Sequence, residues 1–172
     1  TYNENIYINA TNPPVLKIKF GSSTERTATY KSISGKTITY TYTIASGDNG
    51  KLATTSYSGK VYDEVGNSLS VANKTIGGNA ITADTTAPTC TITANPSASP
   101  TNASSITYTF TFSENVTGFA KGDITVTNGT KGTFSGSGTT YTLVVTNTGS
   151  CTQTVSVAAN VCTDAVGNGN TA

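Results

Sequence analysis

Four carboxylates and one amide are the side chains whose types and positions could bind a ligand: Asp48, Asp84, Glu114, Asp164 and Asn168. Carboxylate and amide oxygens, without histidine or thiolate, suit a hard cation such as Ca²⁺. The sequence contains no continuous EF-hand loop, so these ligands would have to come from separate segments. The alternative interpretation is that Asp and Asn in glycine-containing loops cap turns through their own backbone.

Three cysteines, Cys90, Cys151 and Cys162, form the second group with possible chemistry. In an exported chain, three cysteines suggest one disulfide and one remaining thiol. Cys151 and Cys162 flank a predicted strand over residues 152–159, which would hold them up to roughly 36 Å apart, whereas a disulfide needs Cα atoms within about 7 Å. The alternative is that all three are small buried hydrophobic residues. Their spacing does not favour a three-thiolate zinc site.

The composition excludes several classes of function. The chain has 172 residues and no histidine, which excludes Ser-His-Asp and Cys-His nucleophilic machinery and every histidine-based metal site. A net charge of +1 gives no electrostatic footprint for nucleic acid, and no apolar run approaches the roughly 20 residues of a membrane-spanning helix. No activated nucleophile or carboxylate pair in a pocket can be assembled, so we expect that the chain is not an enzyme.

Threonine and turn-forming residues dominate the composition. The chain contains 36 threonines, and charged residues make up only 11% of it. Such a composition is common in exported β-proteins, which stay soluble through hydroxyls and amides. We therefore expect an extracellular chain that neither inserts into a membrane nor binds nucleic acid.

Alternation of apolar residues with threonine predicts the strands that must position these groups. The clearest segments are residues 38–44 and 106–112, where every second side chain is large and apolar. Weaker examples follow at residues 16–20, 124–126, 141–145 and 155–159. Asn-Gly and Gly-Gly turn signals separate the strands, and no segment shows a helical apolar stripe. Many short antiparallel strands predict an all-β fold built from β-sandwiches.

An internal repeat divides the chain in two. The segment 1–6 matches 111–116, and Asp-Glu-Val-Gly-Asn at 63–67 matches Asp-Ala-Val-Gly-Asn at 164–168. Two related units of about 100 residues fit tandem sandwiches. The polar, proline-containing segment 84–88 marks the junction. The predicted domains are residues 1–84 and 85–172.

These motifs resemble the bacterial immunoglobulin-like repeats of large surface proteins and adhesins. Over the second half, the resemblance is carried in order by the linker Asp-Thr-Thr-Ala-Pro-Thr (84–89), Thr-Phe-Ser-Glu-Asn-Val (111–116), Gly-Asp-Ile-Thr-Val-Thr-Asn-Gly-Thr (122–130) and Asp-Ala-Val-Gly-Asn (164–168). The first half resembles a sister type through segments 26–30, 37–44 and 63–67. The resemblance implies tandem immunoglobulin-like β-sandwiches in an extended surface stalk, a class sometimes rigidified by calcium between domains.

A sandwich of this topology would gather the candidate ligands. Glu114 would follow the second strand of the second unit, and Asp164 and Asn168 would precede its last strand, which places all three at one pole. The linker would bring Asp84 to that pole. Asp48, from a far-pole loop of the first unit, could complete a Ca²⁺ site across the joint.

The same topology favours one cysteine pairing. Cys90 opens the first predicted strand of the second unit, and Cys162 closes the next-to-last strand. Both are therefore expected at the linker pole, and Cys90–Cys162 is the favoured disulfide. Cys151 would remain unpaired.

The two units differ at their ends. We expect the first to lack its first strands and the second its last strand, because the matching motifs lie at different distances from the unit boundaries. Either the chain is a segment of a longer repeat array, or a neighbouring copy donates the missing strands. Without them, five apolar side chains of the first unit are expected to have one side uncovered: Ile6, Leu16, Ile18, Tyr40 and Tyr42.

The predicted function is a structural or adhesive extracellular module that forms a surface stalk or fibre. Its expected partners are neighbouring copies or adjacent repeats of the same protein. The alternative is a carbohydrate- or protein-binding module on the cell surface. Because the loops are mostly Gly, Ser, Asn and Thr rather than aromatic, the sequence favours the structural function.

Overall fold

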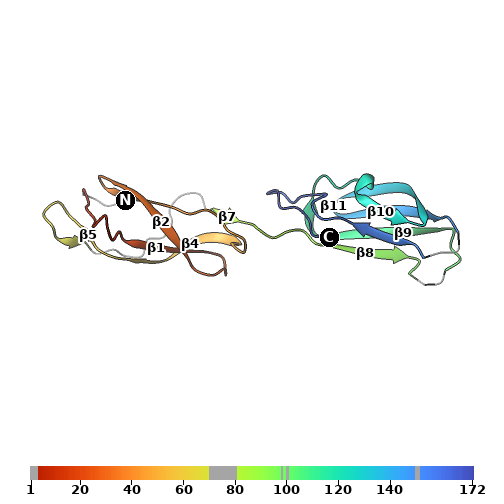
Figure 1. Cartoon of the computed structure of the whole chain (residues 1–172), viewed down its shortest axis with the longest axis horizontal. Helices are drawn as coiled ribbons and strands as arrows, with labels where there is room; N and C mark the ends of the chain where they lie inside the picture. Colours follow the sequence, from red (N-terminus) through yellow and green to blue (C-terminus); the bar gives the residue numbers. More distant parts are fainter. Residues whose placement is uncertain (1–3, 70–80, 98, 100, 150–151) are drawn as a thin grey trace. The chain divides into compact units, whose positions relative to one another are not determined.

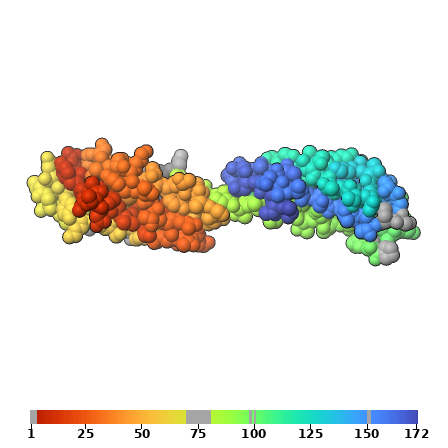
Figure 2. Space-filling model, viewed as in Figure 1, coloured from red at the N-terminus to blue at the C-terminus, as the bar shows by residue number. Residues whose placement is uncertain are grey.

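The computed structural model describes residues 4–69, 81–97, 99, 101–149 and 152–172. The chain forms two compact units, unit 1 over Thr1–Thr85 and unit 2 over Thr86–Ala172 (Figure 1). Each packs as a body of its own in the space-filling view (Figure 2). Strands dominate both units, which confirms the all-β prediction. In the described part of the chain, no helix is long and apolar enough to cross a lipid bilayer.

Unit 1 contains a five-stranded antiparallel sheet in the order β3-β2-β1-β4-β7 and a two-stranded β5-β6 pair. The strands are β1 (Val15–Phe20), β2 (Arg26–Ser34), β3 (Thr37–Thr41), β4 (Gly50–Ser58), β5 (Val61–Tyr62), β6 (Ser68–Leu69) and β7 (Thr82–Ala83). The strand predicted over residues 38–44 thus ends at Thr41. Residues 42–49 instead form the loop into β4.

The core of unit 1 is small, but it buries apolar side chains of β1 and of the segment before it. Ile18 and Phe20 of β1 are 5% and 2% exposed and pack with Ala28 and Ala83. Ile6 is also buried, and its backbone N–H donates to the carbonyl of Gly35 at 3.0 Å. The expectation that Ile6 and Ile18 would have one side uncovered is therefore wrong, because the chain covers both by itself.

Unit 2 contains two antiparallel sheets, β11-β9-β8 and β10-β12. The strands are β8 (Cys90–Asn95), β9 (Ser105–Val116), β10 (Ile124–Thr127), β11 (Gly129–Asn147) and β12 (Thr154–Val157), with a 3₁₀ turn η1 (Lys121–Asp123) before β10. The alternating segments at 106–112, 124–126 and 141–145 lie in β9, β10 and β11, as predicted. β12 is shorter than the strand predicted over residues 152–159.

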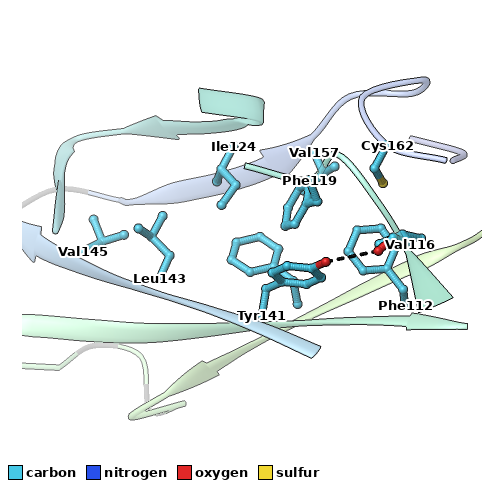
Figure 3. Packing of buried hydrophobic residues seen from close by; sticks show 10 residues of the cluster. Phe112, Val116, Phe119, Ile124, Tyr141, Leu143, Val145, Val157 and Cys162 are labelled. Carbon is cyan, nitrogen blue, oxygen red and sulfur yellow. Dashed lines mark hydrogen bonds between the residues drawn. The ribbon is translucent and has the colours of Figure 1, made fainter. Parts of the chain in front are cut away.

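Aromatic rings fill the core of unit 2 (Figure 3). The Phe119 ring lies 5.0 Å from that of Phe112 and 5.1 Å from that of Tyr141, both edge-on. The Tyr141 hydroxyl donates to the Val116 carbonyl at 3.3 Å, so this buried polar group is satisfied at the end of β9. Leu143 and other alternate residues of β11 complete the layer between the two sheets. This core holds in place the loop that follows β12.

Candidate metal centre

The repeated Asp-x-Val-Gly-Asn motif forms a closed loop in unit 1. The Asp63 backbone N–H donates to the Asn67 carbonyl at 3.0 Å. Asp63 Oδ1 accepts from the backbone N–H groups of Val65 and Asn67 at 3.0 and 2.7 Å, and Oδ2 accepts from Asn67 Nδ2 at 2.8 Å. The carboxylate therefore caps its own turn, which is the alternative interpretation of the motif.

Unit 2 repeats this loop. The Asp164 backbone N–H donates to the Asn168 carbonyl at 3.1 Å. Asp164 Oδ1 accepts from the N–H groups of Val166, Gly167 and Asn168 at 2.9, 2.7 and 2.9 Å, and Oδ2 accepts from Asn168 Nδ2 at 2.8 Å. The sequence repeat is thus also a repeat of hydrogen bonds.

A glycine is required at the fourth position of the motif. Gly66 has a φ of 90° and Gly167 a φ of 98°, in the left-handed region that L side chains rarely adopt. The valine before it points outward in both copies, with Val65 82% and Val166 64% exposed. Backbone geometry, rather than packing, therefore explains the shared Val-Gly.

β9 brings Glu114 to the unit 2 loop. Glu114 lies inside β9, near its end, and not in the loop after that strand as predicted. Thr117 and Thr163 form an antiparallel bridge through hydrogen bonds of 2.8 and 3.1 Å, which joins the segment after β9 to the loop. The carboxylate oxygens of Glu114 and Asp164 lie within 4.8 Å of each other. The predicted meeting of Glu114, Asp164 and Asn168 at one end of the unit is thus seen in unit 2.

The loop keeps the Asp164 carboxylate ionised. Burial raises its pKa, but the hydrogen bonds from Asn168, Val166 and Gly167 outweigh burial and hold the pKa below its usual range. A second carboxylate within 4.8 Å concentrates negative charge at this point. Two oxygens bound to one Ca²⁺ at about 2.3–2.6 Å each can be separated by up to about 5 Å, so this spacing fits one shared ion.

Asp48 has a different role from the one predicted. It is fully buried within unit 1, where Oδ1 lies 3.0 Å from Arg26 Nε and Oδ2 accepts from Tyr42 Oη at 2.6 Å and from the Ala45 N–H at 2.8 Å. The Tyr42 hydrogen bond is the main cause that lowers the Asp48 pKa, followed by the Ala45 N–H. Asp48 is thus fully buried and its charge is paired with Arg26 inside unit 1, which argues against Asp48 as a metal ligand.

Asp84 is exposed in the last residues of unit 1, directly before unit 2 begins. Its predicted participation in the calcium site concerns the junction of the two units and stays a prediction.

The predicted Cys90–Cys162 disulfide is absent from the structure, which has both residues as free thiols. Cys90 packs against the core cluster that contains the buried Cys162, and the charge of Cys90 contributes to the pKa of Cys162, so the two thiols are close enough to interact. Burial is the main cause that raises the pKa of each thiol. Because the thiolate is the species that attacks to form a disulfide, burial in the protonated form slows the formation of the bond. Cys151 lies outside the described residues.

Cys162 should make unit 2 sensitive to alkali. Burial, followed by the charges of Cys90 and Asp123, raises the pKa of Cys162 to about 11. An unfolded thiol ionises near pH 8.5, so the stability that the protonated thiol contributes is complete below that pH and is lost as the pH rises toward 11. We expect Cys162→Ala to flatten the fall of the melting temperature of unit 2 between pH 8.5 and 11. Cys90→Ala, which removes the half-buried thiol, should flatten it less, and equal slopes in both variants would contradict the assignment.

Asn170 is a structural residue that the sequence analysis missed. Its side chain is 1% exposed, and its Oδ1 accepts from the N–H groups of Val161 and Cys162 at 2.9 and 3.1 Å. Its Nδ2 donates to the carbonyls of Ala158 and Thr171 at 2.9 and 2.7 Å. One amide thus ties the turn after β12 to the segment that follows the Asp164 loop. No counterpart follows the matching motif of unit 1, so the repeat gave no signal for it.

Comparison with known proteins identifies unit 2. Residues 84–172 match a family model described as "Bacterial Ig-like domain". No curated protein and no solved structure matches the chain. Domains of this kind are typically extracellular or surface-exposed and are generally non-catalytic. Because the match covers slightly more than half of the sequence, from Asp84 to the last residue, the chain belongs to the bacterial Ig-like domain family.

Proposed function

We propose that this chain is a structural module of a bacterial surface protein, in which two tandem Ig-like units extend a stalk or fibre. The observation that carries the proposal is the Asp-x-Val-Gly-Asn loop, which forms the same backbone closure and the same Asp-Asn side-chain bond in both units. It supports a common origin of unit 1 and unit 2, although the family model matches only residues 84–172. Extended proteins are often built from tandem copies of one structural unit.

Stretching the full chain between two handles tests the tandem arrangement. Two separately folded units should unfold in two events. An extended chain of about 85 residues spans roughly 280–310 Å at ~3.3–3.6 Å per residue, so each event should lengthen the chain by that span minus the end-to-end distance of the folded unit. A single event of twice that length, or one event with unit 1 already extended, would contradict two independent sandwiches.

Surface location is tested on intact cells of the bacterium that produces the protein. An antibody against residues 84–172 should label unpermeabilised cells, and mild protease treatment of those cells should remove the signal. Labelling that appears only after the cells are permeabilised would exclude a surface stalk. A cytoplasmic protein serves as the control for cell integrity.

We also propose that Glu114, Asp164 and Asn168 hold a Ca²⁺ ion that stabilises unit 2. Three features support this: a carboxylate pair within 4.8 Å, an Asp164 carboxylate that the loop keeps ionised, and the neighbouring Asn168 side chain as a further source of oxygen. The equivalent loop of unit 1 provides a natural comparison. Its own glutamate, Glu64, is exposed at the second position of the motif and can serve as the control for Glu114.

A further inference from the structure

A cleft of about 760 Å³ lies in unit 2, at the end to which the β8 arrow points in Figure 1. The residues after β8, the beginning of β9, the last residue of β11 and the beginning of the β12 segment surround it. Its volume is within the range of about 300–1,000 Å³ that small-ligand sites occupy in proteins. None of the residues that form the Asp164 loop lines it. The cleft is therefore separate from the candidate metal centre.

A chain of hydrogen bonds holds the polar wall of the cleft in place. Tyr108 Oη donates to Gln153 Oε1 at 2.8 Å, and Gln153 Nε2 donates to Asn147 Oδ1 at 3.0 Å. Asn147 Nδ2 in turn donates to the Ala103 carbonyl at 2.6 Å, so the chain ends on the backbone. The three side chains come from β9, β11 and the start of the β12 segment. Their orientation is thus fixed before any ligand arrives, which lowers the entropic cost of binding.

These bonds leave hydrogen-bonding capacity on the same atoms. A phenolic oxygen that donates one bond still accepts, and an amide oxygen has two acceptor positions. Ser97, Ser99, Thr101 and Asn102 add hydroxyls and an amide along the opposite wall. Ala94, Pro96 and Ile106 add small apolar surface between them. The cleft therefore presents donors, acceptors and apolar patches at short intervals.

Charge restricts the class of ligand. The described lining contains no Asp, Glu, Lys or Arg. Burial raises the pKa of Tyr108, so its hydroxyl is neutral at physiological pH. A site without charge has no strong partner for a phosphate, a carboxylate or a metal ion. Peptide-binding sites built as an apolar groove or a charged pocket do not match this polar, uncharged lining.

We propose that this cleft binds a neutral saccharide, with Tyr108, Asn147 and Gln153 as its main hydrogen-bonding groups. Each saccharide hydroxyl both donates and accepts, as hydroxyl and amide side chains do. The C–H faces of a sugar ring pack on the small apolar surface. The assignment adds a binding activity to the stalk function and does not depend on calcium or on unit 1.

The test exposes the full chain to an array of neutral and acidic oligosaccharides and then titrates the strongest neutral hit by calorimetry. Tyr108→Phe, which removes one hydroxyl, should weaken binding roughly tenfold. Tyr30→Phe removes the same group from β2 of unit 1 and should leave the affinity unchanged. A thermal unfolding curve of each variant, which should match that of the unmodified chain, checks that the fold is intact.

A second pair of variants blocks the cleft without touching its hydrogen-bond chain. Ser97→Arg places a long side chain at the exposed wall and should abolish binding. Ser156→Arg adds the same side chain to an exposed position of β12 outside the cleft and should not affect it. Failure of every neutral oligosaccharide to bind, binding of acidic oligosaccharides instead, or binding that Ser97→Arg leaves intact would overturn the proposal. None of these results would affect the test of the stalk function by stretching.

Discussion

Replacing Phe119 with alanine is expected to destabilise unit 2 by about 3–5 kcal/mol, the cost usual for removing a buried phenylalanine. Phe119 is 6% exposed and lies edge-on to Phe110, Phe112, Phe134 and Tyr141, at centroid distances of 5.0–5.9 Å. No neighbouring side chain can fill the space, because these rings come from strands fixed by their sheets. In a unit of this size, 3 kcal/mol corresponds to a fall in melting temperature of roughly 12 °C or more.

Hydrogen exchange measured by mass spectrometry on the full chain can assign this loss to one unit. Peptides from β9 and β11 should lose protection in Phe119→Ala, while peptides from β1 and β4 keep theirs. Phe119→Leu should lose less protection because it keeps most of the buried surface. Val166→Ala, at an exposed position of the same unit, should have no measurable effect. Equal loss in both units would mean that the units do not fold independently.

The strands could be predicted from the sequence because their signal is local. Ile106, Tyr108 and Phe110 alternate with threonine, and such alternation fixes which face of a strand is buried. Phe119 and Asn170 could not be predicted in this way. Both lie in irregular segments, where no periodicity separates a buried side chain from an exposed one. The burial of Phe119 depends on rings of β9 and β11, and that of Asn170 on the turn after β12, which folds back onto it.

The candidate site also contains residues that could be placed from the sequence and one that could not. Glu114, Asp164 and Asn168 could be placed together because the repeat and the sandwich topology fix which segments meet. Asp48 was misplaced because its partner Arg26 lies 22 positions away, at the start of β2. That ion pair depends on how β2 lies beside the loop before β4. Sequence spacing does not carry this information.

Calcium is expected to raise the melting temperature of unit 2 in the full chain. A ligand that binds only the folded state stabilises it by mass action, by about 2.7 kcal/mol at a concentration 100 times its Kd. For a unit of this size, that amounts to roughly 10–20 °C above the value in excess chelator. Differential scanning calorimetry with calcium, with magnesium and with chelator measures the shift. Magnesium should raise the melting temperature much less, because it demands a tighter octahedral set of oxygens.

Glu114→Gln is the variant that separates the metal site from the turn cap. Asp164 closes its own loop, so replacing it would destabilise unit 2 with or without calcium. The hydrogen bonds that close the loop join the Asp164 carboxylate to Val166, Gly167 and Asn168. The amide analogue of Glu114 keeps the shape of that side chain while removing its charge. We expect Glu114→Gln to abolish most of the calcium-dependent shift and to leave the melting temperature in chelator nearly unchanged. Glu64→Gln makes the same exchange at the repeated loop of unit 1 and should leave the shift intact. If calcium fails to raise the melting temperature, or raises it equally in both variants, the Asp164 loop serves only to cap its own turn, as the Asp63 loop does.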